Sequence, residues 1–231
     1  MFAIPVILLL LSIGISRYAA QRHETAMRTG ARHGMPGGQT AAEAVREFLD
    51  ANEAKDVQIL EHTAMVSDYF DPKRRTLFLS RTTLNGTDAG SWAVALHEAA
   101  HATQEGDALK ALNWRQGNIR LARYGPTFVA VICMTLTFLK RLPFRSTLMI
   151  CGVLFALIML ANALSMPVEF NASRRVQAWI DEKLGKHPAL QELFASLLSG
   201  VAWRDTGVFV RSPLYFIFSL LPGGGKLRPR K

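Results

Sequence analysis

The sequence predicts a mainly α-helical membrane protein that carries a small α+β, zincin-like catalytic part. Three observations predict this class: charge-free apolar segments, an HExxH motif in a helical stretch, and two short strand-like segments before that motif. The chain is expected to begin with a transmembrane anchor (1–17), a linker (18–39) and a catalytic part (40–123). A transmembrane hairpin (124–166) should follow, and then a helix that carries a third metal ligand together with the next helix (167–204). The chain should end with an apolar or interfacial segment and a basic tail (205–231).

The net charge of +9 is unevenly distributed along the chain. Residues 17–124 carry 14 Lys and Arg against 13 Asp and Glu, whereas residues 140–231 carry 13 against 5. The excess therefore lies beside apolar segments, where basic residues are typical of contact with lipid headgroups. We expect a lipid bilayer as a partner and no nucleic acid. Cys133 and Cys151 both lie in apolar runs, which favours packing over a disulfide or a zinc site.

The first segment, Phe2–Ser16, is apolar throughout and has no basic residue before it. The basic residues that follow it are Arg17, Arg22, Arg28 and Arg32. This asymmetry favours an uncleaved anchor with its N-terminus outside and the following segment in the cytoplasm. The alternative is the apolar region of a cleaved secretory signal.

A glycine-rich stretch over 29–39 is typical of a flexible linker. Thr40 and Glu43 then have the spacing of a capping box, which predicts the start of an amphipathic helix over 41–51.

Two segments, 57–60 and 75–80, have the composition of short strands. Asp68–Pro72 between them is a turn signal, and Asn85–Gly86 is another. We expect the strand at 75–80 to offer an open edge against which an extended substrate could pair.

The HExxH motif, His97 to His101, lies in a helical stretch with Asp88 or Ser91 as its N-cap. Residues four apart share one helical face, so both imidazoles can reach a single metal ion. Glu98 can then lie beside a water and take its proton. The sequence therefore predicts a Zn²⁺ site with a catalytic glutamate. The alternative is a helix that carries two histidines and a glutamate by chance.

Two apolar runs follow a mixed helical segment at 107–123. Tyr124–Leu139 and Ser146–Met166 are free of charge and are joined by a short turn at 140–145. They predict a transmembrane helical hairpin, and a buried hairpin of a soluble protein is the alternative.

The hairpin returns the chain to the side it left, beside the HExxH motif. Glu169 stands there, on a helix that Pro167 is expected to begin and that runs to Leu184. Glu169 is our candidate for the third metal ligand, with an ordinary surface glutamate at a helix start as the alternative. Ser173, one turn further on, could hydrogen-bond a ligand. Another helix is expected from Pro188 to about Arg204.

The membrane orientation rests on charge. The arginines after the first segment favour a cytoplasmic site, although the basic turn at 140–145 opposes it. We expect an integral, multi-pass protein of the bacterial cytoplasmic membrane. The segment 208–221 is apolar but interrupted by Arg211 and Pro213, so it either lies at the interface or forms a fourth span.

The chain resembles the bacterial membrane zinc metallopeptidases of the YugP type, the neutral zinc metallopeptidase family. The matching stretches are Thr40–Arg46, Asp68–Ser80, Val94–Gln104 and Pro167–Arg175, within roughly 38–200. The resemblance implies a membrane zinc protease with His97, His101 and Glu169 on the metal and Glu98 catalytic. The layout is more distantly similar to HtpX and the CAAX prenyl endopeptidases, which have an aspartate where this chain has Ser173.

We therefore expect a zinc metalloendopeptidase of the gluzincin type that acts on peptide or protein substrates, with Glu98 as general base. The alternative function is a non-catalytic membrane protein with a structural or vestigial zinc site. A zinc site within the bilayer is disfavoured, because the HExxH helix is too short to span it. His62, Tyr69 and His187 are available to stabilise the oxyanion, but none has a pattern that selects it.

Overall fold

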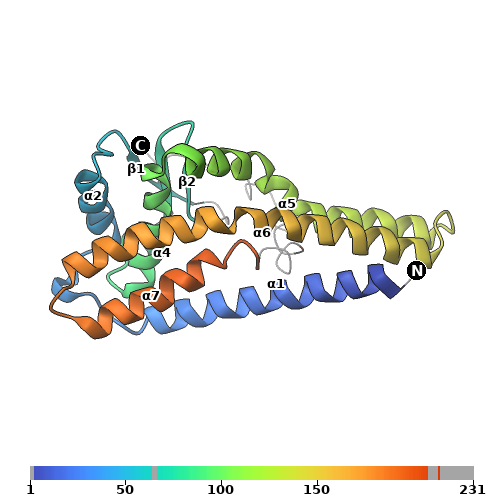
Figure 1. Cartoon of the computed structure of the whole chain (residues 1–231), viewed down its shortest axis with the longest axis horizontal. Coiled ribbons are helices and arrows are strands. Elements are labelled where there is room, and N and C mark those ends of the chain that lie inside the picture. The colour runs from blue at the N-terminus through green and yellow to red at the C-terminus, as the bar shows by residue number, and fades with distance from the viewer. Residues whose placement is uncertain (1–2, 64–66, 208–212, 214–231) are drawn as a thin grey trace.

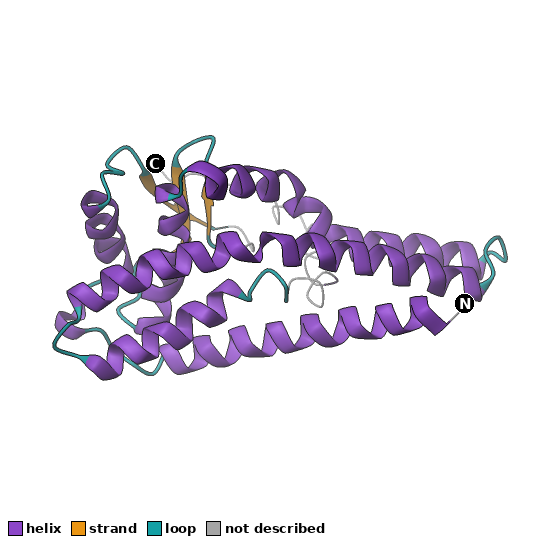
Figure 2. Ribbon diagram, in the orientation of Figure 1, coloured by secondary structure: helices purple, strands orange, loops and turns teal. Residues whose placement is uncertain are grey.

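The computed structural model describes residues 3–63, 67–207 and 213, and three long helices run along its longest dimension (Figure 1). These are α1 (Ala3–Gly30), α5 (Gly106–Phe138) and α6 (Phe144–Lys183), and α6 contacts both of the others. A compact part at one end holds α2 (Ala41–Ala51), α4 (Ala89–Ala100), α7 (Pro188–Ala202) and a small sheet (Figure 2). The predicted mainly helical chain with a short sheet is confirmed.

The sheet consists of β1 (Gln58–His62), β2 (Tyr69–Asp71) and β3 (Thr76–Ser80), in the order β1-β3-β2. β3 pairs in parallel with β1 and antiparallel with β2, so it is the central strand. The prediction that 75–80 offers an open edge is therefore wrong. Four consecutive residues of β3 are buried, as a strand covered on both faces requires. β2 occupies most of the segment Asp68–Pro72, which was expected to be a turn, and the turn in the structure follows at 72–75.

α2 begins with the predicted capping box. The Glu43 amide donates to Thr40 Oγ1 at 3.3 Å, and the Thr40 amide donates to Glu43 Oε2 at 2.8 Å. Reciprocal caps of this kind satisfy backbone donors that a helix start leaves without partners. The apolar face of α2 buries Val45, Phe48 and Leu49 completely against the core around α4.

α4 is the central helix of the compact part, and α2, α6 and α7 all pack against it. Asp88 is its N-cap, because Asp88 Oδ1 accepts a hydrogen bond from the Ser91 amide at 2.9 Å. Trp92 and Leu96 are buried among apolar residues of the surrounding elements. The α-helix ends at Ala100, and a 3₁₀ turn, η2 (His101–Thr103), continues it. The HExxH motif therefore spans the last turn of α4 and the start of η2.

The linker expected over 18–39 is helical as far as Gly30, because α1 continues well past the anchor. Gly30 is a packing residue: a Cβ at this position would lie 2.6 Å from the Gly90 Cα. The chain beyond α1 is also attached to α4, since the His33 carbonyl accepts a hydrogen bond from the Ala89 amide at 2.8 Å. A 3₁₀ turn, η1 (Pro36–Gly38), then leads towards α2. The glycine at position 30 is therefore explained by its close packing against Gly90, and not by a need for a flexible chain.

The predicted helical hairpin is present as the second half of α5 and the first half of α6 (Figure 1). The expected boundaries at 123/124 and 166/167 fall inside these helices. The prediction that Pro167 begins a new helix is wrong, because Pro167 lies within α6. A proline removes one helical hydrogen bond, but the following turns bury Val168, Ala172 and Val176 against the core, which favours continuation.

Two helices, Ala3–Gly30 and Phe144–Lys183, are long and apolar enough to cross a membrane by length and composition. Tyr124–Phe138, the other arm of the hairpin, is a shorter apolar stretch. Only 22% and 39% of the most apolar windows of the two long helices are buried within the protein. Large apolar side chains such as Leu10, Phe128 and Leu160 are instead exposed. The segment 208–221 and the basic tail lie outside the described residues, apart from Pro213.

Asp68 joins the start of β2 to the end of β3 and the short helix α3 (Arg81–Leu84). Its buried carboxylate accepts hydrogen bonds from the Ser80 amide and from Thr83 Oγ1, and it lies 3.3 Å from His62 Nε2. Burial alone would raise the pKa of Asp68, but the hydrogen bonds from His62, Thr83 and Ser80 outweigh burial and lower it.

A lowered folded-state pKa stabilises the protein above the unfolded value of about 4, and the benefit is lost as the pH falls through the folded value. We expect Asp68→Asn to lower the free energy of unfolding by about 1–3 kcal/mol at neutral pH. The difference in melting temperature from the parent, measured in detergent, should shrink below about pH 4. The exposed Asp107→Asn is the control. A difference that stays constant down to pH 2 would show that the charge of Asp68 does not stabilise the fold.

Candidate metal centre

Three buried side chains from different parts of the chain converge at the end of α4. His97 comes from the last turn of α4, His101 from η2 and Glu169 from α6, and each is at most 1% exposed. Glu169 Oε2 lies 3.0 Å from His97 Nε2 and 3.7 Å from His101 Nε2. One potential ligand atom from each residue lies within 4.8 Å of the other two. The structure thus brings together the three residues that the sequence proposes as metal ligands.

Ser173 determines the tautomer of His97. Its hydroxyl donates to the Leu198 carbonyl at 3.1 Å and lies 3.1 Å from His97 Nδ1. Because the serine proton is already directed at Leu198, its oxygen accepts from His97, and the imidazole proton resides on Nδ1. The predicted contact between Ser173 and a candidate ligand is confirmed. Nε2 of His97 is left with a lone pair that faces Glu169.

Gln104 does the same for His101. Its amide nitrogen donates to the Val168 carbonyl at 2.8 Å and to Asn171 Oδ1 at 3.1 Å. Its oxygen therefore accepts from His101 Nδ1, 3.0 Å away, which leaves a lone pair on His101 Nε2. That nitrogen is buried and has no hydrogen-bond partner among the described residues.

These tautomers place three acceptors against one another. Nε2 of both histidines and Oε2 of Glu169 carry lone pairs, and a buried cation between them would satisfy all three. Burial lowers the pKa of His97 and outweighs the opposing effect of Glu169, whereas for His101 burial is outweighed by the interactions with Glu169 and the charge of Glu98, which raise the pKa. A bound metal requires both imidazoles to be neutral. Two imidazole nitrogens and one carboxylate oxygen form a donor set typical of catalytic zinc. The residues present fit Zn²⁺.

Two buried arginines flank the carboxylates of the site. Arg115 Nη1 lies 3.1 Å from Glu169 Oε1, and Arg115 Nη2 contacts Asp205. Arg204 Nη2 lies 2.5 Å from Glu98 Oε1, and Arg204 Nε lies 3.5 Å from Asp205 Oδ1. Three carboxylates and two guanidinium groups leave one negative charge in excess. Such an excess favours the binding of a cation.

Glu169 is held in its ionised form. Burial alone would raise the pKa of its carboxyl group, but the charge of Arg115 lowers it and holds that pKa well below its usual range. Glu169 is therefore a carboxylate, the form that binds metal ions. Glu98, the residue after the first histidine, is only 2% exposed and belongs to the same buried cluster.

Gln104, Arg115, Arg204 and Asp205 were missed by reasoning from the sequence. Gln104 lies three residues after the second histidine and has a local signal, since i and i+3 are neighbours on a helical face. The other three contact the site only through the tertiary fold, and no local spacing marks them.

The residues that the sequence left available for oxyanion stabilisation, without selecting one, have other contacts. His62 is buried beside Asp68, Tyr69 stacks on Phe78 with ring centroids 5.1 Å apart, and His187 is exposed at the start of α7. None has a described contact with the three converging side chains.

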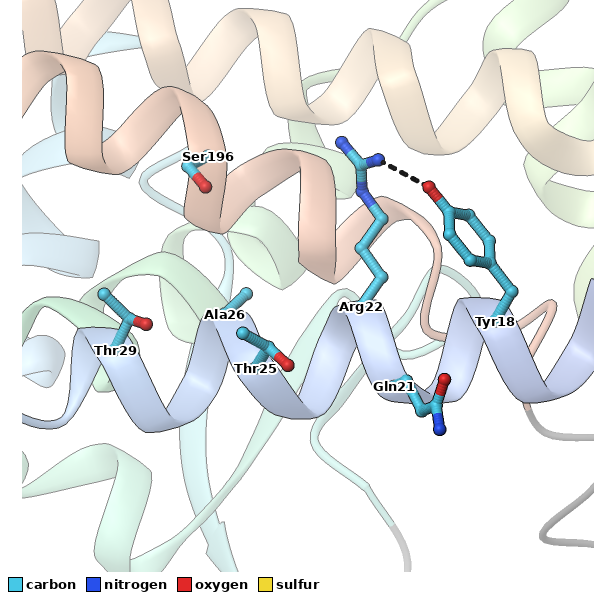
Figure 3. Close-up of a pocket in the computed structure, with 7 residues that line it drawn as sticks. All are labelled: Tyr18, Gln21, Arg22, Thr25, Ala26, Thr29 and Ser196. Carbon is cyan, nitrogen blue, oxygen red and sulfur yellow. Dashed lines mark hydrogen bonds between the residues drawn. The ribbon is translucent and has the colours of Figure 1, made fainter.

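A surface pocket of about 340 Å³ opens between α1 and α7 (Figure 3). Arg22 lies in it and donates to the Tyr18 hydroxyl at 3.2 Å. None of its lining residues belongs to the candidate metal centre, so the pocket is separate from it. The lining residues are Tyr18, Gln21, Arg22, Thr25, Ala26, Thr29 and Ser196.

Comparisons with known proteins identify the family of the chain. The family model described as "Putative neutral zinc metallopeptidase" matches residues 2–199. The chain is 26% identical over 172 residues to the "Putative membrane protease YugP" of Bacillus subtilis (strain 168), and the match covers 74% of this chain and 75% of that protein. No solved structure matches the chain significantly. The chain therefore belongs to the YugP-type neutral zinc metallopeptidase family.

Proposed function

We propose that the chain is a membrane-bound zinc endopeptidase, with His97, His101 and Glu169 as the metal ligands and Glu98 as the general base. The observation that carries this proposal is the convergence of three buried lone pairs, one of them on a nitrogen without a hydrogen-bond partner among the described residues, beside a second buried carboxylate. Three protein ligands leave a fourth position open, as catalytic zinc sites do.

The chemistry is hydrolysis of a peptide bond. Bound zinc would supply a Lewis acid and lower the pKa of a water to about 7. Glu98 takes a proton from the attacking water and then returns it to the nitrogen of the leaving amine. Ser173 and Gln104 keep both imidazoles in the tautomer with a free Nε2. Burial keeps bulk water away from these groups and strengthens their electrostatic interactions.

The alternative of a structural zinc site has less support. Structural sites usually have four protein ligands, commonly cysteines. Both cysteines of this chain lie in the hairpin, where Cys133 and Cys151 pack in an apolar cluster separate from the main core. Glu98 has no role in such a site.

Membrane attachment is part of the proposal. The apolar halves of α1, α5 and α6 extend together away from the compact part, and they expose large apolar side chains that water solvates poorly. A lipid bilayer would cover them. The compact part, with the candidate centre, would then lie at the membrane surface, and the arginines that follow residue 16 favour the cytoplasmic side.

Metal removal tests the proposed activity. We expect protein purified from membranes in detergent to cleave fluorescent casein and to lose this activity on dialysis against 1,10-phenanthroline. One equivalent of Zn²⁺ should restore the activity, whereas Mg²⁺ should not, because imidazole ligands favour zinc over magnesium. Cleavage that survives complete zinc removal would contradict the proposal.

A further inference from the structure

Arg204 makes direct contact with the proposed general base. It follows the end of α7, and its side chain is 9% exposed while that of Glu98 is 3% exposed. Arg204 Nη2 donates a charge-assisted hydrogen bond to Glu98 Oε1. A buried guanidinium group therefore lies beside the carboxylate that must contact the attacking water.

The two buried arginines contact different carboxylates of the site. Both terminal nitrogens of Arg115 contact carboxylates, one on Glu169 and one on Asp205. Within the described part of the chain, Arg204 donates a hydrogen bond to Glu98, and its Nε lies 3.5 Å from Asp205 Oδ1. Its Nε is buried and lacks a hydrogen-bond partner there. Each arginine therefore has two carboxylates within ion-pair distance, but Arg204 is the one that contacts the proposed general base, and its Nε is a donor without a hydrogen-bond partner among the described residues.

A donor without a hydrogen-bond partner at this position has a chemical use. The attacking water bonds to the carbonyl carbon, and the oxygen on that same carbon gains negative charge as it does so. A group that touches Glu98, which touches the water, is within reach of that oxygen. The rigid guanidinium fork can keep one nitrogen on Glu98 and direct another elsewhere.

We propose that Arg204 is a catalytic residue that donates a hydrogen bond to the oxygen of the scissile carbonyl as that oxygen becomes negatively charged. This inference rests on the proposed peptidase function. Preorganised donors aimed at developing charge are among the largest contributors to catalysis in buried sites.

The proton and electron balance is complete without a further reactant. The water oxygen bonds to the carbonyl carbon, the π electron pair moves onto the carbonyl oxygen, and the water proton moves to Glu98. The pair then returns, the C–N bond breaks and the proton passes from Glu98 to the nitrogen, which releases an amine and a carboxylic acid. Arg204 stays protonated throughout and only donates hydrogen bonds.

The test compares Arg204→Gln and Arg204→Lys in the zinc-loaded full chain. Arg174→Gln is the matched control, because Arg174 is exposed on α6. The two readouts are the kinetic constants on a fluorogenic peptide and the Kd of a phosphinic peptide, which mimics the tetrahedral anion, by calorimetry. Each variant is also made with Glu98→Gln, so that no buried carboxylate is left without its partner and folding is preserved.

We expect Arg204→Gln to lower kcat by about 10²–10³-fold, with KM within a few-fold and zinc content unchanged. Phosphinic-peptide binding should weaken by a similar factor, also in the Glu98→Gln background, and Arg204→Lys should be intermediate. Unchanged phosphinate binding in Arg204→Gln would overturn the inference. So would an effect that disappears in the Glu98→Gln background, because Arg204 would then act only by positioning Glu98.

The same experiment separates this inference from the proposed function. A parent protein that neither retains zinc nor binds the phosphinic peptide would overturn both. A parent that does both, beside an Arg204→Gln variant that cleaves equally well, would overturn only the role of Arg204. Loss of zinc from Arg204→Gln would also overturn that role, since the residue would then support the metal site.

Discussion

Glu98→Gln should retain zinc and lose cleavage by about 10²–10⁴-fold in kcat, the range that a positioned general base contributes. The amide has nearly the shape of the carboxylate, but it cannot accept the proton of the attacking water. Glu98 is not among the candidate ligands, so the metal site keeps all three of its donors. The measurement is kcat on a fluorogenic peptide together with zinc content by atomic absorption.

Two outcomes would contradict the role of Glu98. Cleavage at the parent rate in Glu98→Gln would exclude Glu98 as the general base. Loss of zinc from this variant would show that Glu98 is needed for metal binding. Glu105→Gln is the matched control, because Glu105 lies a few residues further along the chain and is exposed. It should behave as the parent in both measurements.

Glu169→Gln should weaken zinc binding by more than about 100-fold. Loss of a residue that only hydrogen-bonds a metal ligand weakens metal binding by roughly 10–100-fold, and Glu169 is proposed to bind the metal itself. Glu169 is the only acidic residue in the described three-residue cluster, and its Oε2 lies 3.0 Å from His97 Nε2 and 3.7 Å from His101 Nε2. The substitution also removes the negative charge that faces Arg115, so the charge of the site becomes less favourable to a cation. Competition with a fluorescent chelator measures the zinc Kd.

The exposed Glu182→Gln, on the same helix, is the control for this substitution. It should bind zinc as the parent does. An unchanged zinc Kd in Glu169→Gln would move the third ligand to another residue. The amide keeps the side-chain volume, which limits the packing loss that an alanine would add.

The local features of this fold follow from short sequence patterns. Thr40 and Glu43 specify the start of α2, and Asp88 specifies that of α4, because both caps depend on contacts within one helical turn. The helical hairpin follows from two charge-free runs and a short turn, and its geometry explains how Glu169 returns to the HExxH motif. The candidate ligands could therefore be proposed from the sequence alone.

Features that depend on tertiary contacts could not be predicted. The central position of β3 requires partners on both sides, which its own sequence does not specify. Gly30 lies in a stretch whose composition is typical of a linker, but it packs against Gly90. Proline is common at a helix start, but Pro167 lies inside α6. The helix continues there because burial of the following turns outweighs the loss of one backbone hydrogen bond.

The two arginines of the site also could not be predicted from the sequence, because they reach it only through tertiary contacts. Arg115 reaches Glu169 from another helix, and Arg204 is 106 positions from Glu98 in the chain. Neither has a local spacing that links it to the motif. Only the fold shows that Arg204 contacts Glu98 and that its Nε has no hydrogen-bond partner among the described residues, which are the observations on which the proposed role of Arg204 depends.

X-ray absorption at the zinc edge tests the metal centre most directly. For the zinc-loaded full chain in detergent we expect one zinc per chain, surrounded by nitrogen and oxygen at about 2.0–2.2 Å, with the outer-shell scattering of two imidazoles. The same measurement on Glu169→Gln should show a depleted zinc signal. Sulfur scattering at about 2.3 Å, or a coordination shell unchanged in Glu169→Gln, would contradict a centre formed by His97, His101 and Glu169.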